Sequence, residues 1–242
     1  FRKNLLFVIG SHSRDNDGKL KRARSILVGL KLTGKTDLKI VREGLPYKGI
    51  KQSLLDDHRY KKFELDRRKE SDRKLAPKAG QTLNIEGMAV DRDQDSLLIG
   101  FGGPLYDGKA LVTKLLNPLK VIRAEKKPKF SDPILLNLEG QGIRSFEYWR
   151  ENDTFIIVAG NVSEQRGFQI FKWSGNPNAK PVKINNFLAE KSFNPEALVF
   201  FPGQKTKFLL LSDDGSLKKS GIACKDLPEK KRSFRGRFIN YK

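Results

Sequence analysis

The chain repeats one pattern of apolar and polar positions. An apolar run ends in Gly or Ser inside a short polar loop, as in LLFVIGSHSR (5–14), LLIGFGGPLYDG (97–108), FIIVAGNV (155–162) and FLLLSDDG (208–215). Short apolar runs bounded by turn residues are typical of β-strands. Each run with its loop therefore predicts a strand that ends in a turn.

Two further segments accompany these runs. Three of the runs are preceded by a segment with its own signature, NIEGMAVD (84–91), EGQGIRSF (139–146) or NPEALVFF (194–201), and apolar segments such as SILVGLKL (25–32), KALVTKLL (109–116) and FQIFKWSG (168–175) follow. Self-similarity at this spacing indicates a repeat architecture, and repeated strands favour a β-propeller. We predict an all-β chain in which residues 1–242 form a single β-propeller domain of five or six blades.

The repeat pattern has two irregularities. No counterpart of NIEGMAVD precedes the first run, so we expect the upstream part of the first blade to be missing from this sequence, and a signal peptide stays an open question. Residues 50–74 lose the strand pattern, and the spacing of Ile50, Leu54 and Leu55 predicts a helical insertion there. The segment SFRGRFINY (233–241) can supply a last strand.

Composition narrows the class of protein. Hydrophobic residues make up 38% of the 242 residues, and no apolar run approaches the roughly 20 residues that span a bilayer. The single cysteine, Cys224, excludes an intrachain disulfide, and one Cys with two His excludes the usual Cys/His zinc site. These features suit a soluble protein of the cytoplasm or the periplasm, and they do not choose between the two.

The chain is strongly basic, with a formal net charge of +20 and a pI near 10.0. Its basic clusters, residues 58–74 and 218–242, also contain acidic residues, and neither has the order of a known nucleic-acid-binding motif. We favour a solvated surface, and we keep weak, nonspecific nucleic-acid binding as the alternative.

In order along the chain, the motifs GSHSR, NIEGMAVD, GFGGPL, GQGIR, SDDGS and FRGRF resemble an uncharacterised bacterial family catalogued only as a domain of unknown function. The resemblance covers nearly the whole chain, from Gly10 to Phe238. It implies a propeller with distant similarity to the esterase-like-phytase and quorum-regulated propeller groups, and it implies no established activity. This chain is more basic than the family leads us to expect.

The first candidate site comes from aligning the repeats. Glu86, Gln141 and Glu196 fall at one position, just before the small residues Gly87, Gly142 and Ala197. Equivalent positions of successive blades lie around one ring, so we expect these side chains to meet near the axis together with Arg144. Oxygen ligands from several blades suit Ca²⁺, which makes Glu86 and Glu196 candidate metal ligands. The alternative, which we favour, is that each carboxylate bonds backbone amides or pairs with an arginine such as Arg144.

The second candidate site is formed by loops that follow the apolar runs. His12 and Arg14 lie in one loop, and Asp213 and Asp214 lie in another. Arginine binds phosphate or carboxylate groups through a planar fork, and histidine titrates near neutral pH. The sequence Ser-Asp-Asp-Gly is also an ordinary tight turn, which is our preferred interpretation of Asp213 and Asp214. For His12 and Arg14, a binding and a structural role stay equally open.

Three classes of function follow. We favour a non-catalytic ligand-binding or interaction propeller with a polar channel mouth, whose partner is a small anionic ligand or a protein. The first alternative is a metal-assisted, phosphoesterase-like hydrolase that uses the channel carboxylates. The second is a binder of nucleic acid or another anionic surface through the basic segments. Whether the protein is an enzyme is left open.

Overall fold

The computed structural model describes residues 4–15, 19, 21–34, 36–65, 82–161, 167–184 and 192–241. Four larger antiparallel sheets follow one another along these residues, together with one two-stranded sheet. Sheet 1 contains β1 (Leu5–Ile9), β2 (Leu27–Thr33) and β3 (Lys39–Tyr47). Sheet 2 contains β4 (Asn84–Val90), β5 (Leu97–Gly103), β6 (Ala110–Leu115) and β7 (Ile134–Leu136). Sheet 3 contains β8 (Gly142–Trp149), β9 (Thr154–Gly160), β10 (Gln169–Trp173) and β11 (Val182–Lys183).

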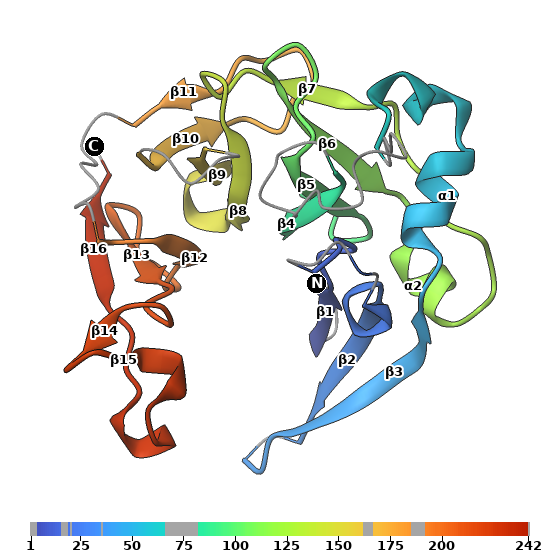
Figure 1. Cartoon of the computed structure of the whole chain (residues 1–242). Coiled ribbons are helices and arrows are strands. Elements are labelled where there is room, and N and C mark those ends of the chain that lie inside the picture. The colour runs from blue at the N-terminus through green and yellow to red at the C-terminus, as the bar shows by residue number, and fades with distance from the viewer. Residues whose placement is uncertain are drawn as a thin grey trace.

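Sheet 4 contains β12 (Pro195–Val199), β13 (Lys207–Ser212) and β16 (Gly236–Asn240). Strands β14 (Lys218–Lys219) and β15 (Ile222–Ala223) form a small hairpin that lies between β13 and β16 in sequence. The four sheets lie in an arc around a common centre, and the arc is open between sheet 4 and sheet 1 (Figure 1). The prediction of an all-β chain is confirmed, whereas the described sheets do not close into a ring.

Three hydrophobic cores hold the arc together, one at each junction between neighbouring sheets. Successive side chains of a strand point to opposite faces of its sheet. In β5, Leu97 and Ile99 therefore pack in the core shared with sheet 1, while Leu98 packs in the core shared with sheet 3. The same alternation in β9 divides its residues between the second and third cores. Because both of their faces are covered, β5 and β9 are buried along their whole length.

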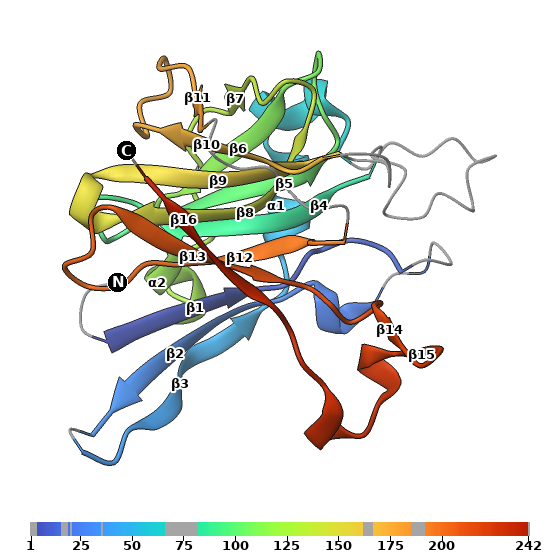
Figure 2. The ribbon, with the colours of Figure 1, turned by 90° about the vertical axis from the view of Figure 1, so that its left-hand side faces the viewer.

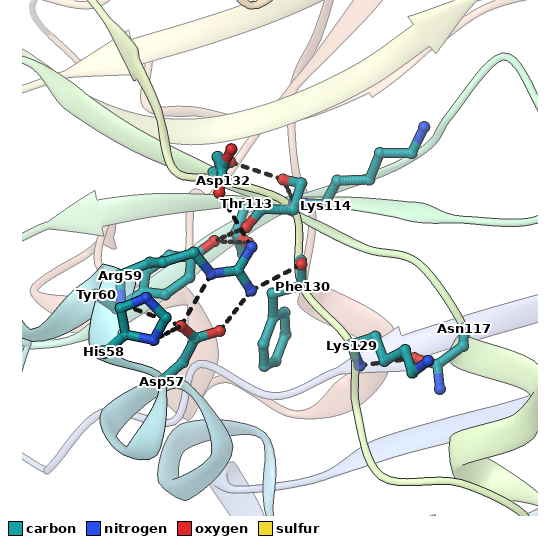
Figure 3. Close-up of polar contacts among 11 residues, drawn as sticks. Asp57, His58, Arg59, Tyr60, Thr113, Lys114, Asn117, Lys129, Phe130 and Asp132 are labelled. Atoms are coloured by element: carbon teal, nitrogen blue, oxygen red, sulfur yellow. Dashed lines mark hydrogen bonds and ion pairs between the residues drawn. The ribbon is translucent and has the colours of Figure 1, made fainter.

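The helical insertion predicted for residues 50–74 is present in its first part. Helix α1 (Ile50–Asp56) is followed by a 3-10 helix over His58–Phe63, and residues 66–74 lie outside the described residues. Arg59 bonds Asp57 within the insertion and reaches Asp132 and the carbonyl of Phe130 beyond β6, as Figure 3 shows. Burial raises the pKa of Tyr60 to about 12, and its hydroxyl bonds Thr113 and the carbonyl of Ser131. These contacts fix the insertion to sheet 2.

Strand β3 and helix α2 (Pro118–Ile122) are elements that the sequence analysis did not predict. Strand β3 was missed because charged residues and a Gly-Leu-Pro sequence interrupt its apolar pattern. The last strand predicted within 233–241 is β16. Within the residues described above, no helix combines the length and apolar character needed to cross a membrane.

Candidate functional site

The first strands of sheets 2, 3 and 4 share a β-bulge near their start. The pairing register shifts at Glu86 between Ile85 and Gly87 in β4, and it shifts at the same place in β8 and β12. A bulge inserts one residue that has no partner opposite it and re-aims its side chain. The three bulged residues are all charged, namely Glu86, Arg144 and Glu196.

This register corrects the alignment of the repeats. Arg144, and not Gln141, is the counterpart of Glu86 and Glu196, because β8 begins at Gly142 and its bulge follows two residues later. The sequence alignment had matched the Gln-Gly pair at residues 141–142 with the Glu-Gly pair at residues 86–87, which is three residues out of register. Gln141 is buried just before β8, where its amide nitrogen donates to the carbonyl of Gly167 at 2.7 Å.

The bulged residues of sheets 2 and 3 form an ion pair. Arg144 Nη1 lies 2.5 Å from Glu86 Oε2, and Asn84 donates a hydrogen bond to the other carboxylate oxygen of Glu86. Burial opposes the charge of Arg144, but attraction to Glu86 outweighs it and raises the pKa of the guanidinium. Two glycines make room for the pair: a Cβ on Gly102 would lie 3.0 Å from the Glu86 carboxyl carbon, and one on Gly160 would lie 2.9 Å from Arg144 Cγ.

Glu196 occupies the equivalent bulge in sheet 4 but has weaker partners. Asn194 Nδ2 lies 3.3 Å from Glu196 Oε1. Burial raises the pKa of Glu196 to about 7; attraction to Arg144 opposes the shift, whereas repulsion from Glu86 and Asp213 adds to it. The site therefore contains two glutamates that interact with Arg144, and the pKa of Glu196 is raised toward neutral pH. An Asn-x-Glu sequence begins β4 and, one residue before the strand, leads into β12, and this shared sequence is an unused signal for the arrangement.

His12 lies in the loop that follows β1. The loop is next to the start of β4, since the Ile85 amide donates to the carbonyl of Ser11 at 2.8 Å. His12 is buried, adopts a left-handed backbone with a φ of 53°, and places Nδ1 2.8 Å from the carbonyl of Gly10. Its Nε2 is buried and has no hydrogen-bond partner among the described residues. Burial lowers the pKa of His12, so its ring is neutral at pH 7. The neighbouring residue Arg14 accepts a hydrogen bond at its carbonyl from Arg24.

Asp213 and Asp214 bond within their own part of the fold, as a tight turn predicts. Asp213 is exposed and accepts a hydrogen bond from the Gly215 amide at 2.9 Å. Asp214 is buried and accepts bonds from the Arg235 guanidinium and from the hydroxyl of Ser212. Chiefly through Arg235, these bonds lower the pKa of Asp214 to about 2. Asp214 therefore joins the turn to the start of β16.

The site offers little to a metal ion. In the part of the chain that the structure describes, no group of three or more His, Cys, Asp or Glu side chains could hold one. Arg144 already supplies a positive charge to both glutamates. A carboxylate that the sequence analysis missed lies further along β8, where burial raises the pKa of Glu147 to about 7. Its position in an otherwise apolar stretch of a central sheet was the available signal.

Comparison with known proteins gives a family but no activity. The model of the family described as a protein of unknown function, DUF3616, matches residues 21–233. No curated protein matches the chain.

Proposed function

The chain belongs to this DUF3616 family, whose function is unknown, and we propose that it is a non-catalytic, ligand-binding β-propeller. The four sheets are its blades, with β4, β8 and β12 toward the axis. The proposed binding site consists of Glu86, Arg144 and Glu196, where these three strands begin.

One observation carries the proposal. Three neighbouring sheets have a charged residue at the same bulge, and their side chains interact electrostatically although they lie up to 110 residues apart in sequence. Bulges are frequent next to binding sites because they turn a side chain out of the regular ladder. A core that needed only packing would gain nothing from three half-buried charges, since burying a charge is costly unless it is well paired.

The charges indicate the chemistry of the ligand. Glu86 is paired with Arg144 and Asn84, whereas the one hydrogen bond of the Glu196 carboxyl among the described residues is a long contact of 3.3 Å with Asn194. Asp213 adds a further negative charge beside Glu196. This environment favours a small ligand whose recognised group donates hydrogen bonds, as an ammonium or hydroxyl group does. It is less suited to the anionic ligand that the sequence suggested.

A thermal-shift screen tests the proposal. The panel contains small amines, polyols, carboxylates and phosphate esters, and it is applied to the native chain, to Glu196→Gln and to Glu139→Gln. Glu139 is an exposed glutamate paired with Lys183, so its variant is the matched control. A ligand present at a hundredfold excess over its Kd stabilises the fold by about 2.7 kcal/mol, which raises Tm by several degrees. We expect an amine or polyol to do so in the native chain and in Glu139→Gln, and to lose most of its effect in Glu196→Gln. The proposal fails if no compound shifts Tm or if Glu196→Gln responds like the native chain.

A hydrolase is the second candidate, and it rests on a different property of the same residues. Glu86 forms an ion pair with Arg144, while the raised pKa of Glu196 lets it hold a proton near pH 7. A carboxyl group that can hold a proton near neutral pH, beside a second carboxyl group in a different environment, is what general acid–base catalysis uses. An assay with chromogenic phosphate esters and glycosides tests this function, and turnover that disappears in Glu196→Gln would place the protein among enzymes.

A further inference from the structure

Two segments project from the arc of sheets on the same side of the molecule. One is the end of the hairpin that β2 and β3 form, residues 31–34 and 36–42, which we call the β2–β3 tip. The other is the chain between β13 and β16, residues 216–234, which we call the β13–β16 lobe. Both extend beyond the rest of the chain at its lower edge in Figure 1, and they still do so in Figure 2, which is turned about the vertical axis. One flat surface can therefore touch both segments at once.

The β2–β3 tip exposes apolar side chains among cations. Leu38 is 66% exposed and Ile40 is 63% exposed, and neither belongs to the cores formed by the described residues. Asp37 is the one acidic residue in the sequence of this tip, and its Oδ2 lies 3.4 Å from Lys39 Nζ. The cations of the tip are all exposed, namely Lys31, Lys39 and Arg42. The end of a hairpin is normally polar, so burial of these two apolar side chains against a partner would be favourable.

The β13–β16 lobe has the same combination of exposed apolar and basic residues. Phe234 is 68% exposed, and Ile222 is 51% exposed. The lobe contains six lysine or arginine residues against two acidic residues, and all eight are exposed. Arg232 donates a hydrogen bond to the carbonyl of Leu227, which does not neutralise its charge. The lobe therefore presents a positive surface that also contains an aromatic ring and an aliphatic side chain.

We propose that the β2–β3 tip and the β13–β16 lobe dock together on an anionic lipid bilayer. Their apolar side chains enter the boundary between headgroups and acyl chains, and their lysine and arginine side chains lie at the level of the lipid phosphates. Negatively charged headgroups attract each of these cations. The net charge of +20 also draws the whole chain toward such a surface.

The shape and the chemistry of the two segments favour a bilayer over other partners. A bilayer is flat and deformable, so it receives two separate projections without a surface that matches each of them. A nucleic acid would bind the cations through its phosphates but would leave Leu38 and Ile40 in water. A second copy of the chain carries the same charge of +20 and would be repelled.

Co-sedimentation with lipid vesicles tests the proposal. One set of vesicles is pure phosphatidylcholine, and in the other about a third of the lipid is phosphatidylserine, which makes the surface negative. Leu38→Ser/Ile40→Ser removes the apolar side chains of the β2–β3 tip. Lys230→Glu/Lys231→Glu reverses two charges of the β13–β16 lobe. All four positions are exposed, and circular dichroism checks that both variants are folded.

The matched controls change residues at the opposite, upper edge of the molecule in Figure 1. Val182→Ser replaces a valine of β11 that is 53% exposed, so it controls for the loss of an exposed apolar side chain. Lys61→Glu/Lys62→Glu reverses two charges in the 3-10 helix that follows α1. It changes the net charge by the same amount as the lobe variant, so it separates a local contact from attraction by the overall charge.

We expect the native chain and both controls to bind the phosphatidylserine vesicles and to bind phosphatidylcholine vesicles much more weakly. The tip variant and the lobe variant should each lower binding by about tenfold or more. The proposal is overturned if the native chain binds neither kind of vesicle or binds both equally. It is also overturned if only one of the two variants loses binding, or if Lys61→Glu/Lys62→Glu loses as much as Lys230→Glu/Lys231→Glu.

Two further measurements identify other partners. Sedimentation velocity without lipid should show a monomer, and a dimer that Leu38→Ser/Ile40→Ser dissociates would overturn the proposal in favour of a second copy. A single-stranded oligonucleotide that displaces the chain from the vesicles at physiological salt would overturn it in favour of nucleic acid. The thermal-shift screen of small ligands does not depend on these outcomes, because it monitors Glu196.

Discussion

Strands β5 and β9 of the central sheets differ from β1 and β13 of the end sheets in how their two faces are covered and not in their apolar character. The run LLIGF of β5 is buried on both sides, whereas the run LLFVI of β1 buries only Phe7, and the run FLLLS of β13 leaves Leu209 and Leu211 partly open. An apolar run in a sheet that is covered on one side only is unusual, because such strands normally alternate apolar and polar residues. The contrast teaches that an apolar run alone does not fix burial on both faces, because β1 and β13 carry apolar residues on a face that takes no part in the cores formed by the described residues.

The largest expected effect is on the free energy of unfolding. It compares two equivalent positions, one on a covered face of a sheet and one on an uncovered face. Ile156 of β9 and Leu209 of β13 each follow the first Phe of their run, and each points away from the preceding sheet. Ile156→Ala should lower the free energy of unfolding by about 3 kcal/mol, because it leaves a cavity in a packed core. Leu209→Ala should cost less than about 1 kcal/mol because its side chain is partly in water. Urea denaturation monitored by circular dichroism measures both, and equal losses would show that the side of β13 on which Leu209 lies is already covered.

The next effect on stability concerns the contact between Asp214, which follows β13, and Arg235, which precedes β16 in sheet 4. Asp214→Asn removes the charged partner of Arg235 and should destabilise the chain by about 2 kcal/mol, the range of hydrogen bonds to charged groups. Asp213→Asn is the matched control and should change stability by less than about 0.5 kcal/mol, since Asp213 is exposed.

The pH dependence provides an independent check of the same pair. The folded pKa of Asp214, about 2, lies below its ordinary value, so its stabilising contribution is present above pH 4 and is lost as pH falls toward 2. Asp214→Asn should therefore flatten the acid limb of a plot of Tm against pH. An unchanged acid limb would contradict the role given to the Arg235 pair.

The sequence predicted the strands better than it predicted the site. Strand cycles were recognised because β4 to β6 and β8 to β10 are short apolar runs separated by turns. Strand β3 was not recognised, because it lies at the edge of sheet 1 and is largely exposed, so burial did not shape its sequence.

The register of the sheets could not be predicted from the sequence, for a reason that lies in the backbone. The sequence grouped Glu86, Gln141, Arg144 and Glu196 and aligned Gln141 with the two glutamates, whereas the bulges of β4, β8 and β12 align Arg144 with them. A bulge shifts the register by one residue, and a sequence motif cannot reveal which residue is unpaired. Likewise, the carboxylate of Asp214 was a candidate ligand until its bond to Arg235, 21 residues away, was known.

A smaller effect on thermal stability is expected at the two glutamates that occupy equivalent bulges, Glu86 in a central sheet and Glu196 in an end sheet. The folded pKa of Glu196, about 7, lies above its ordinary value, so its contribution to stability is present below about pH 4.5 and is lost as pH rises to 7. Glu196→Gln cannot ionise, and we expect it to be more stable than the native chain at pH 8, with Tm higher by a few degrees. Glu86→Gln should instead lower Tm at pH 8, because it breaks the ion pair with Arg144. Calorimetry at pH 5 and pH 8 measures both, and a Glu196→Gln variant that is less stable at pH 8 would show that its charge is well compensated.

The smallest expected effect is on nucleic-acid binding by the two basic segments, which lie in different regions of the arc. Lys61 and Lys62 follow α1 beside sheet 2, whereas Lys230 and Lys231 follow the β14–β15 hairpin at the other side of the arc (Figure 1); Arg67 and Arg68 lie outside the described residues. Because these cations are divided between two sites, few of them can contact one nucleic acid at once. Each neutralised phosphate releases counterions, so binding by a few cations is weak and falls steeply with salt.

In fluorescence anisotropy with a labelled single-stranded oligonucleotide, we therefore expect binding at low salt that disappears near physiological salt. The variants Lys230→Glu/Lys231→Glu and Lys61→Glu/Lys62→Glu should each reduce the low-salt signal by a similar factor, because neither cluster dominates. Submicromolar affinity at physiological salt that only one of the two variants removes would reverse this expectation. It would make that cluster a nucleic-acid site; near Lys230 and Lys231 in sequence, the exposed ring of Phe234 is available for base stacking.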